Sequence, residues 1–235
     1  MKRSVNNLIG YTINAKDGEI GKVNEFFFDD VTWSIRYLVV DTGNWFAEKK
    51  VLLPHAALGK TDWKSRTFHV NLTMEQIKKS PDVDTEKTVS RQNEIELFGH
   101  YMLPVYWGEE FYATPLGMVP LPPIIDEKKL EGSEKPTHQI PENHHLRSTN
   151  KVKGYHIHAN DGEIGHLEDF LVDDEKWNLC SFVVDTKNWL SGRRVLIQPG
   201  IIKRIVWDES EIYVNVSRET IKNSPMFDPV QTELK

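Results

Sequence analysis

The chain has 235 residues, of which 39% are hydrophobic and 27% charged, and its formal net charge is −6. No segment has a strong basic excess, which disfavours proteins that bind a phosphate backbone nonspecifically. The single cysteine excludes an intramolecular disulfide and favours a reducing compartment. The sequence shows neither a signal-peptide pattern nor the roughly 20 apolar residues that span a bilayer. We therefore expect a cytoplasmic protein, for which peripheral membrane association stays open.

The sequence contains a long internal repeat. Residues 10–81 align with residues 154–225 at an offset of 144 residues without a gap, and 29 of the 72 positions are identical. GYTINAKDGEIG at 10–21 corresponds to GYHIHANDGEIG at 154–165, and LVVDTGNW at 38–45 corresponds to FVVDTKNW at 182–189. A repeat of this length predicts two copies of one small domain. The copies differ in net charge, +1 for the first and −4 for the second, so their outer faces need not bind the same partner.

The first half of each copy reads as a β-hairpin. In the first copy, residues 11–15 alternate between apolar and polar side chains, and Asp17-Gly18 is a strong hairpin signal. A second strand is expected over residues 19–28, where Gly21 indicates a bulge or a close approach of another backbone. Asp29-Asp30 then predicts a turn, because aspartate side chains bind nearby backbone amides.

The second half of each copy predicts three more strands and a helix. The strand at 33–41 has an apolar centre, Tyr37-Leu38-Val39-Val40, so both of its faces are expected to be covered. Further strands are expected at 49–53 and 67–72, and the capping box at 73–76 predicts a short helix to about residue 79. This pattern is typical of a small barrel or curled sheet. A domain of about 70 residues buries only about 60% of its unfolded surface, so the copies are expected to pack together or to form a homodimer.

Two different segments separate the copies. Residues 82–107 contain an apolar pattern, with Ile95, Leu97 and Phe98, that predicts a helix. Residues 108–150 hold six prolines among polar residues and are expected to be a flexible linker. The predicted organisation is a first copy at 1–81, a connecting segment at 82–107, a linker at 108–150, a second copy at 151–225 and a tail at 226–235.

These motifs together resemble the PRC-barrel family. The resemblance rests on DGEIGKVNEFFFDD, WSIRYLVVDTGNW and KKVLLP in the first copy, and on DGEIGHLEDFLVDD, WNLCSFVVDTKNW and RRVLIQP in the second. This family includes the cytoplasmic domain of the photosynthetic reaction-centre H subunit and the C-terminal domain of the ribosome maturation factor. The resemblance implies a mainly β protein with two small antiparallel barrels, each ending in a short helix, that serve protein assembly. Unlike the reaction-centre subunit, this sequence shows no membrane helix. Unlike the ribosome maturation factor, it has a second PRC copy in place of a different N-terminal barrel.

Few polar residues indicate catalysis or metal binding. His156, His158 and His166 could form a metal cluster, but the first copy has Thr12, Asn14 and Lys22 at these positions, which favours a solvated surface. The pairs Asp29-Asp30 and Asp173-Asp174 are explained by turns, and no histidine or aspartate spacing makes Cys180 a nucleophile. We expect no catalytic residue, no metal site and no cofactor.

The strand exits provide a candidate partner-binding rim, because an aromatic side chain beside polar groups suits an interface. The rim comprises Asp41, Asn44, Trp45, Asp185, Asn188 and Trp189. The leading hypothesis is a non-enzymatic interaction module that binds a protein partner or itself. The alternatives are a ribosome- or RNA-linked factor, which the acidic balance disfavours, and an accessory of a photosynthetic reaction centre that influences electron or proton transfer.

Overall fold

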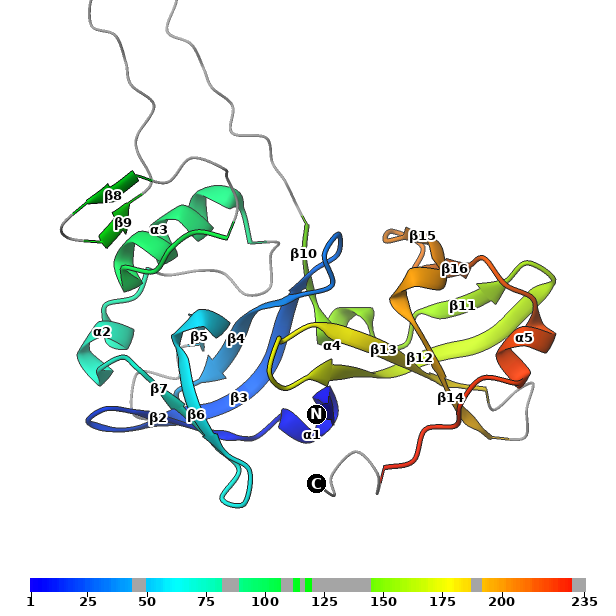
Figure 1. Cartoon of the computed structure of the whole chain (residues 1–235), viewed down its shortest axis with the longest axis horizontal. Helices are drawn as coiled ribbons and strands as arrows, with labels where there is room; N and C mark the ends of the chain where they lie inside the picture. Colours follow the sequence, from blue (N-terminus) through cyan, green and yellow to red (C-terminus); the bar gives the residue numbers. More distant parts are fainter. Residues whose placement is uncertain are drawn as a thin grey trace, which may run out of the picture.

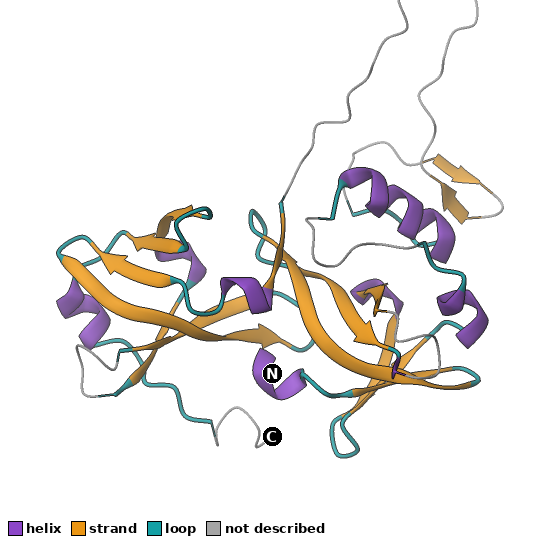
Figure 2. Cartoon of the chain, turned by 180° about the vertical axis from the view of Figure 1, so that it is seen from behind, coloured by secondary structure: helices purple, strands orange, loops and turns teal. Residues whose placement is uncertain are grey.

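The computed structural model describes residues 1–43, 50–81, 89–106, 112–114, 117–119, 145–186 and 192–229. They form two seven-stranded sheets that lie side by side, with the N-terminal end of the chain between them (Figures 1 and 2). The prediction of a mainly β protein is confirmed. In the described part of the chain, no helix has the length and apolarity needed to cross a membrane.

The first sheet has the strand order β5-β4-β3-β2-β7-β6, and a further strand, β10, pairs with β3. Its strands are β2 (Thr12–Ala15), β3 (Gly18–Asp29), β4 (Ile35–Asp41), β5 (Lys50–Pro54), β6 (Leu58–Asp62), β7 (Thr67–Val70) and β10 (Leu146–Ser148). The helices of the first copy and the connecting segment are α1 (Val5–Leu8), the 3-10 helix η2 (His55–Ala57), α2 (Met74–Lys78) and α3 (Arg91–Tyr101), of which α1 lies against β12 of the second sheet.

The second sheet repeats this arrangement as β14-β13-β12-β11-β16-β15, with β1 paired to β12. Its strands are β1 (Lys2–Ser4), β11 (His156–Ala159), β12 (Gly162–Asp173), β13 (Leu179–Asp185), β14 (Arg194–Ile197), β15 (Ile202–Val206) and β16 (Glu211–Val214). The helices of the second copy are α4 (Thr149–Val152), η4 (Pro199–Ile201) and α5 (Arg218–Lys222), of which α4 lies against β3 of the first sheet. A separate hairpin is formed by β8 (Tyr112–Thr114) and β9 (Gly117–Val119).

The prediction of closed, antiparallel barrels is wrong. β2 pairs with β7 in parallel, as β11 does with β16. β5 and β6 are the two ends of the first sheet, and within the described residues they do not pair with each other. Only the three residues of η2 separate β5 from β6 along the chain, yet no strand pairing closes the sheet between them. Each sheet is therefore open.

Short N-terminal arms are exchanged between the two copies. β3 has 12 residues, whereas its neighbour β2 has four and pairs only with the first part of β3. β10, from the second copy, pairs antiparallel with the remainder of the same edge, at residues 27–29. β1, from the first copy, completes β12 in the same way at residues 171–173. An unpaired strand edge is thus covered in each sheet by the other copy.

A buried carboxylate fixes each exchanged arm. Ser4 Oγ accepts a hydrogen bond from the amide of Asn7, which caps α1, and donates to Asp169 of the other copy. Ser148 Oγ likewise caps α4 and donates to Glu25. Burial raises the pKa of the Asp169 carboxyl, although hydrogen bonds from Ser4 and two backbone amides act in the opposite direction. Each arm therefore donates hydrogen bonds to a buried carboxylate, Asp169 in one half and Glu25 in the other. Without the arm, that carboxylate would be buried with fewer hydrogen-bond donors.

Aromatic side chains join the two copies into one hydrophobic core. Phe28 of β3 lies against Phe170 of β12 with 5.6 Å between ring centroids, and Phe26 lies 6.2 Å from Trp177. The predicted mutual packing is thus present within one chain. The prediction that both faces of the 33–41 strand are covered is also confirmed, because its four central residues are fully buried.

The structure explains why both copies have glycine at positions 21 and 165. A Cβ atom at Gly21 would lie 2.0 Å from the carbonyl oxygen of Asp41, and one at Gly165 would lie 2.0 Å from that of Asp185. The predicted close backbone approach is therefore confirmed. The expected helix at 73–79 is α2, with the Thr73–Gln76 capping box, but β6 was not predicted.

The linker prediction needs one correction. Residues 146–150 were assigned to the linker, but they form β10 and the beginning of α4. Most of residues 108–144 lies outside the described residues. Part of the predicted tail extends the second sheet, because the amide of Phe227 donates to the carbonyl of Arg194 and Met226 forms a bridge with Val195.

The expected helix in the connecting segment is α3, which packs on the first sheet through contacts with Tyr37 and Leu52. Leu97, Phe98 and Tyr101 are its buried apolar face. Glu94, 1% exposed, accepts hydrogen bonds from Tyr37 Oη at 2.9 Å and Tyr106 Oη at 2.6 Å. Arg91 forms an ion pair with the other carboxylate oxygen at 2.7 Å. α3 is therefore anchored by a satisfied polar network as well as by apolar contacts.

Candidate functional site

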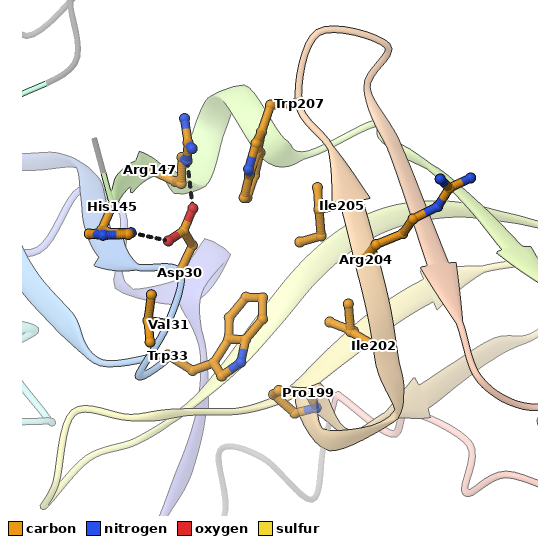
Figure 3. Close-up of a pocket in the computed structure, with 10 residues that line it drawn as sticks. All are labelled: Asp30, Val31, Trp33, His145, Arg147, Pro199, Ile202, Arg204, Ile205 and Trp207. Atoms are coloured by element: carbon orange, nitrogen blue, oxygen red, sulfur yellow. Dashed lines mark hydrogen bonds and ion pairs between the residues drawn. The ribbon is translucent and has the colours of Figure 1, made fainter. Parts of the chain in front are cut away.

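A cleft with a volume of about 520 Å³ lies where the two copies meet (Figure 3). Three segments line it: the β3–β4 turn of the first copy, the exchanged arm β10, and the η4–β15 region of the second copy. The lining residues are Asp30, Val31, Trp33, His145, Arg147, Pro199, Ile202, Arg204, Ile205 and Trp207. Its volume is within the range of small-molecule and side-chain binding pockets.

The β3–β4 turn places Trp33 at the cleft. Asp29 Oδ1 accepts hydrogen bonds from the amides of Val31 and Thr32, and the amide of Trp33 donates to the carbonyl of Asp29. Trp33 has a φ of 58°, in the left-handed region that costs a bulky residue about 1–2 kcal/mol. Its counterpart Trp177 has a φ of 57°. Both turns thus accept backbone strain, and in both the residue that bears it is a tryptophan.

An ion pair lies across the cleft between the two copies. Arg147 Nε donates to Asp30 Oδ2 at 2.8 Å, and His145 Nδ1 lies 3.3 Å from Asp30 Oδ1. The Arg147 guanidinium also lies over the Trp207 ring, 4.0 Å from its centroid. Figure 3 shows Asp30 between His145 and Arg147, whereas the side chain of Arg204 extends away from them. Both oxygens of the Asp30 carboxylate face cationic or hydrogen-bonding groups, so the cleft offers engaged polar side chains beside its apolar walls.

The same polar contacts occur at the equivalent place in the other half. Arg3 Nε donates to Asp174 Oδ2 at 3.0 Å, and the guanidinium of Arg3 lies 4.2 Å from the centroid of Trp63. Asp174 also binds the amino group of Met1. Each arm arginine therefore bridges an aspartate of one copy and a tryptophan of the other, a use of the planar guanidinium that lysine could not reproduce.

The predicted rim is only partly within the described residues. Asn44, Trp45, Asn188 and Trp189 lie outside them. Asp41 is exposed, and its Oδ1 accepts a hydrogen bond from the amide of Gly43 at 2.9 Å. Asp185 is buried, at 4% exposure. Asp41 ends β4 while Trp33 precedes it, so the cleft and this rim lie at opposite ends of the strand.

The histidines weighed as a metal cluster lie on neighbouring strands, His156 and His158 on β11 and His166 on β12. His156 and His166 are cross-strand partners, and His156 Nδ1 lies 3.0 Å from Glu163 Oε1. The described part of the chain contains no group of three or more His, Cys, Asp or Glu side chains placed to hold a metal ion. Burial raises the pKa of the Cys180 thiol, which disfavours the nucleophilic thiolate.

Sequence reasoning did not identify the cleft, although two signals for it were available. Arg3-Ser4 and Arg147-Ser148 are also related by the offset of 144 residues, just before the aligned region. Extending the repeat to them would have predicted an arm with the same role in both copies. The tryptophans at 33 and 177 were aligned, but alignment alone does not show that they meet the other copy.

Comparison with known protein families agrees with the sequence resemblance over the first copy, and one similar protein was also found. An uncharacterized protein of Deinococcus radiodurans is 32% identical over 105 residues, which cover 40% of this chain and 38% of that protein. The chain thus corresponds to less than half of the length of this relative. Residues 2–76, from the exchanged arm β1 into α2, match the PRC-barrel domain.

Proposed function

We propose that this protein is a non-catalytic, cytoplasmic interaction module, in which two PRC-type copies form one body that binds a segment of a protein partner. The match of residues 2–76 to the PRC-barrel domain supports this for the first copy. The equivalent strand order of the second sheet supports the assignment of a second PRC-type copy.

The observation that carries the proposal is the composite cleft. Its walls come from both copies and from an exchanged arm, so it forms only when the two halves fold together. Two tryptophans and three aliphatic side chains line it beside an ion pair, a mixture of aromatic and charged groups that suits the centre of a protein interface. The Asp30 carboxylate is engaged by Arg147 and His145, which disfavours a role as a general base.

Substitution at the cleft mouth tests this proposal. Val31 is 65% exposed, so Val31→Asp adds a charge beside the cleft with little effect on the core. Met102→Asp is a matched control, because Met102, the C-cap residue of α3, is 81% exposed and the cleft does not include it. Both variants and the wild type would be used to capture proteins from the native source, followed by quantitative mass spectrometry.

We expect a partner that is captured by the wild type and by Met102→Asp and is lost with Val31→Asp. Equal capture by all three proteins would contradict binding at the cleft. Turnover in a substrate screen would contradict the non-catalytic part of the proposal. The rim that includes Asp41 and Asp185 remains a second predicted surface, and Asp41→Lys in the same assay would test it.

A further inference from the structure

We propose that the cleft receives an aromatic side chain, of the size of phenylalanine, from the partner's segment. This inference rests on the proposed function and specifies the partner's chemistry. In both halves, the arm arginine contacts an aspartate and a tryptophan in the same way. The inference comes from the aromatic contacts of the tryptophans, which differ between the two halves.

In the first copy, an internal phenylalanine bridges the two equivalent tryptophans. The ring centroid of Phe68 lies 5.6 Å from that of Trp177 and 6.1 Å from that of Trp63. Phe68 is fully buried, and Trp177 is only 8% exposed. Tryptophan rings from both copies therefore already enclose an aromatic ring on this side of the molecule.

In the second copy, the position of Phe68 is occupied by Ile212. Trp33 and Trp207, the counterparts of Trp177 and Trp63, both line the cleft and are both half-buried. Isoleucine cannot provide the ring-to-ring contacts that phenylalanine makes. Ile212 is fully buried, and the cleft lining does not include it. Trp33 instead contacts Phe28 and Phe182, with ring centroids 5.7 and 5.2 Å away. Trp207 contacts Tyr155 at 6.2 Å. Among the described residues, no single ring contacts both tryptophans as Phe68 does in the first copy.

The wall beside these tryptophans is also more apolar than the equivalent residues of the first copy. Pro199 and Ile205 stand where the first copy has His55 and Thr61. Pro199, Ile202 and Ile205 are half-buried and line the cleft, so their apolar surface is partly in contact with water. Covering this surface with a ring would remove it from water, and an aromatic group gains additional energy from stacked or edge-to-face contacts with tryptophan.

The test uses the full-length protein and small capped amino acids as probes. N-acetyl-phenylalaninamide is titrated into ¹⁵N-labelled protein while the indole N–H signals of the seven tryptophans are followed. Trp33→Phe and Trp207→Phe assign the two cleft signals. We expect these two signals to shift selectively, with a Kd on the order of 1 mM for so small a ligand. N-acetyl-leucinamide should bind about fivefold more weakly, because it lacks the aromatic contacts.

Two substitutions at one position provide the controls. Ile205→Trp places a large ring in the cleft and should abolish the shifts, while Ile205→Thr restores the residue of the first copy and should weaken binding about fivefold. Circular dichroism would show that both variants are folded. Equal binding of the leucine and phenylalanine probes, or shifts at other tryptophans only, would overturn the inference.

The outcome is separable from that of the proposed function. If the probe fails to bind but partner capture still depends on Val31, the cleft binds a protein segment through other chemistry. If neither occurs, the proposed function itself fails.

Discussion

Ser34 and Asn178 occupy equivalent positions of the repeat and contact each other, with 2.7 Å between Ser34 Oγ and Asn178 Oδ1. Two backbone hydrogen bonds flank this contact, from the amide of Ile35 to the carbonyl of Trp177 and from the amide of Leu179 to the carbonyl of Trp33, each 2.7 Å long. A contact between equivalent positions lies on a pseudo-twofold axis, so the two copies are arranged as the subunits of a symmetric dimer would be.

Removing either arm serine should destabilise the whole body. Ser4→Ala removes a hydrogen bond to buried Asp169 together with the cap of α1, and we expect a loss of about 2–3 kcal/mol. Ser148→Ala should cost a similar amount through Glu25. Urea unfolding, followed by tryptophan fluorescence and circular dichroism, should show one transition that moves to lower urea in both variants.

The exposed Ser65 provides the control, since Ser65→Ala should change stability by less than about 0.5 kcal/mol. Two separate transitions, of which each variant affected only one, would show that the copies fold independently.

Two glycine substitutions should have opposite effects on stability. Gly21→Ala would force a methyl group onto the carbonyl oxygen of Asp41 and should destabilise the protein by about 3 kcal/mol or more. Gly99→Ala, in α3, meets no atom within 4 Å and should stabilise it by about 0.5–1 kcal/mol. Thermal unfolding of both variants measures the difference. A Gly21→Ala protein with wild-type stability would mean that the two backbones are not in contact.

The pH dependence of stability should change with Asp169→Asn. Burial raises the pKa of this carboxyl, so the folded state binds its proton more tightly than the unfolded state. The wild type therefore loses stability as pH rises from about 3.8 through the raised pKa. Asparagine cannot ionise, so the stability of Asp169→Asn relative to the wild type should increase over this interval, as measured by urea unfolding between pH 3 and 7.

Asp173→Asn is the control with the opposite sign. A hydrogen bond from the amide of Lys176 is the main cause of the lowered pKa of Asp173, so its ionised form stabilises the folded state above the unfolded pKa. The stability of this variant relative to the wild type should fall as pH rises. The same slope for both variants would contradict the assignment.

Removing the buried carboxylate of Glu94 should release α3 from the first sheet. Glu94→Ala leaves Tyr37, Tyr106 and Arg91 without their common acceptor, and we expect a cost of about 3 kcal/mol. Hydrogen exchange of the α3 amides should accelerate by about 100-fold, while exchange in β12 changes little. Glu96→Ala, on the exposed side of the same helix, should leave exchange nearly unchanged. Uniform acceleration across both sheets would indicate global destabilisation instead.

The sequence predicted local elements better than the relations between them. Strand periodicity, the Asp17-Gly18 turn and the Thr73 cap each depend on neighbouring residues, and each is present in the structure. β6 was missed because its sequence, LGKTD, lacks a continuous apolar face. The three-residue arms are too short for periodicity, and their pairing depends on partners more than 100 residues away.

The candidate site was not predictable for the same reason. Asp30 reads as a turn residue, and Arg147 was assigned to a linker, because a single sequence does not show that they form an ion pair. The difference between Phe68 and Ile212 was visible in the alignment, but its meaning depends on the positions of four tryptophans in the folded protein.

The exchange of arms has a consequence for synthesis on the ribosome. The first sheet takes its seventh strand from residues 146–148, so its β3 edge stays incomplete after residue 81 has been made. At about 5–20 residues per second, the missing strand follows roughly 3–13 seconds later. During this interval the nascent chain exposes an unpaired β edge, which a chaperone, or another nascent chain on the same messenger, could bind before the protein's own arm arrives.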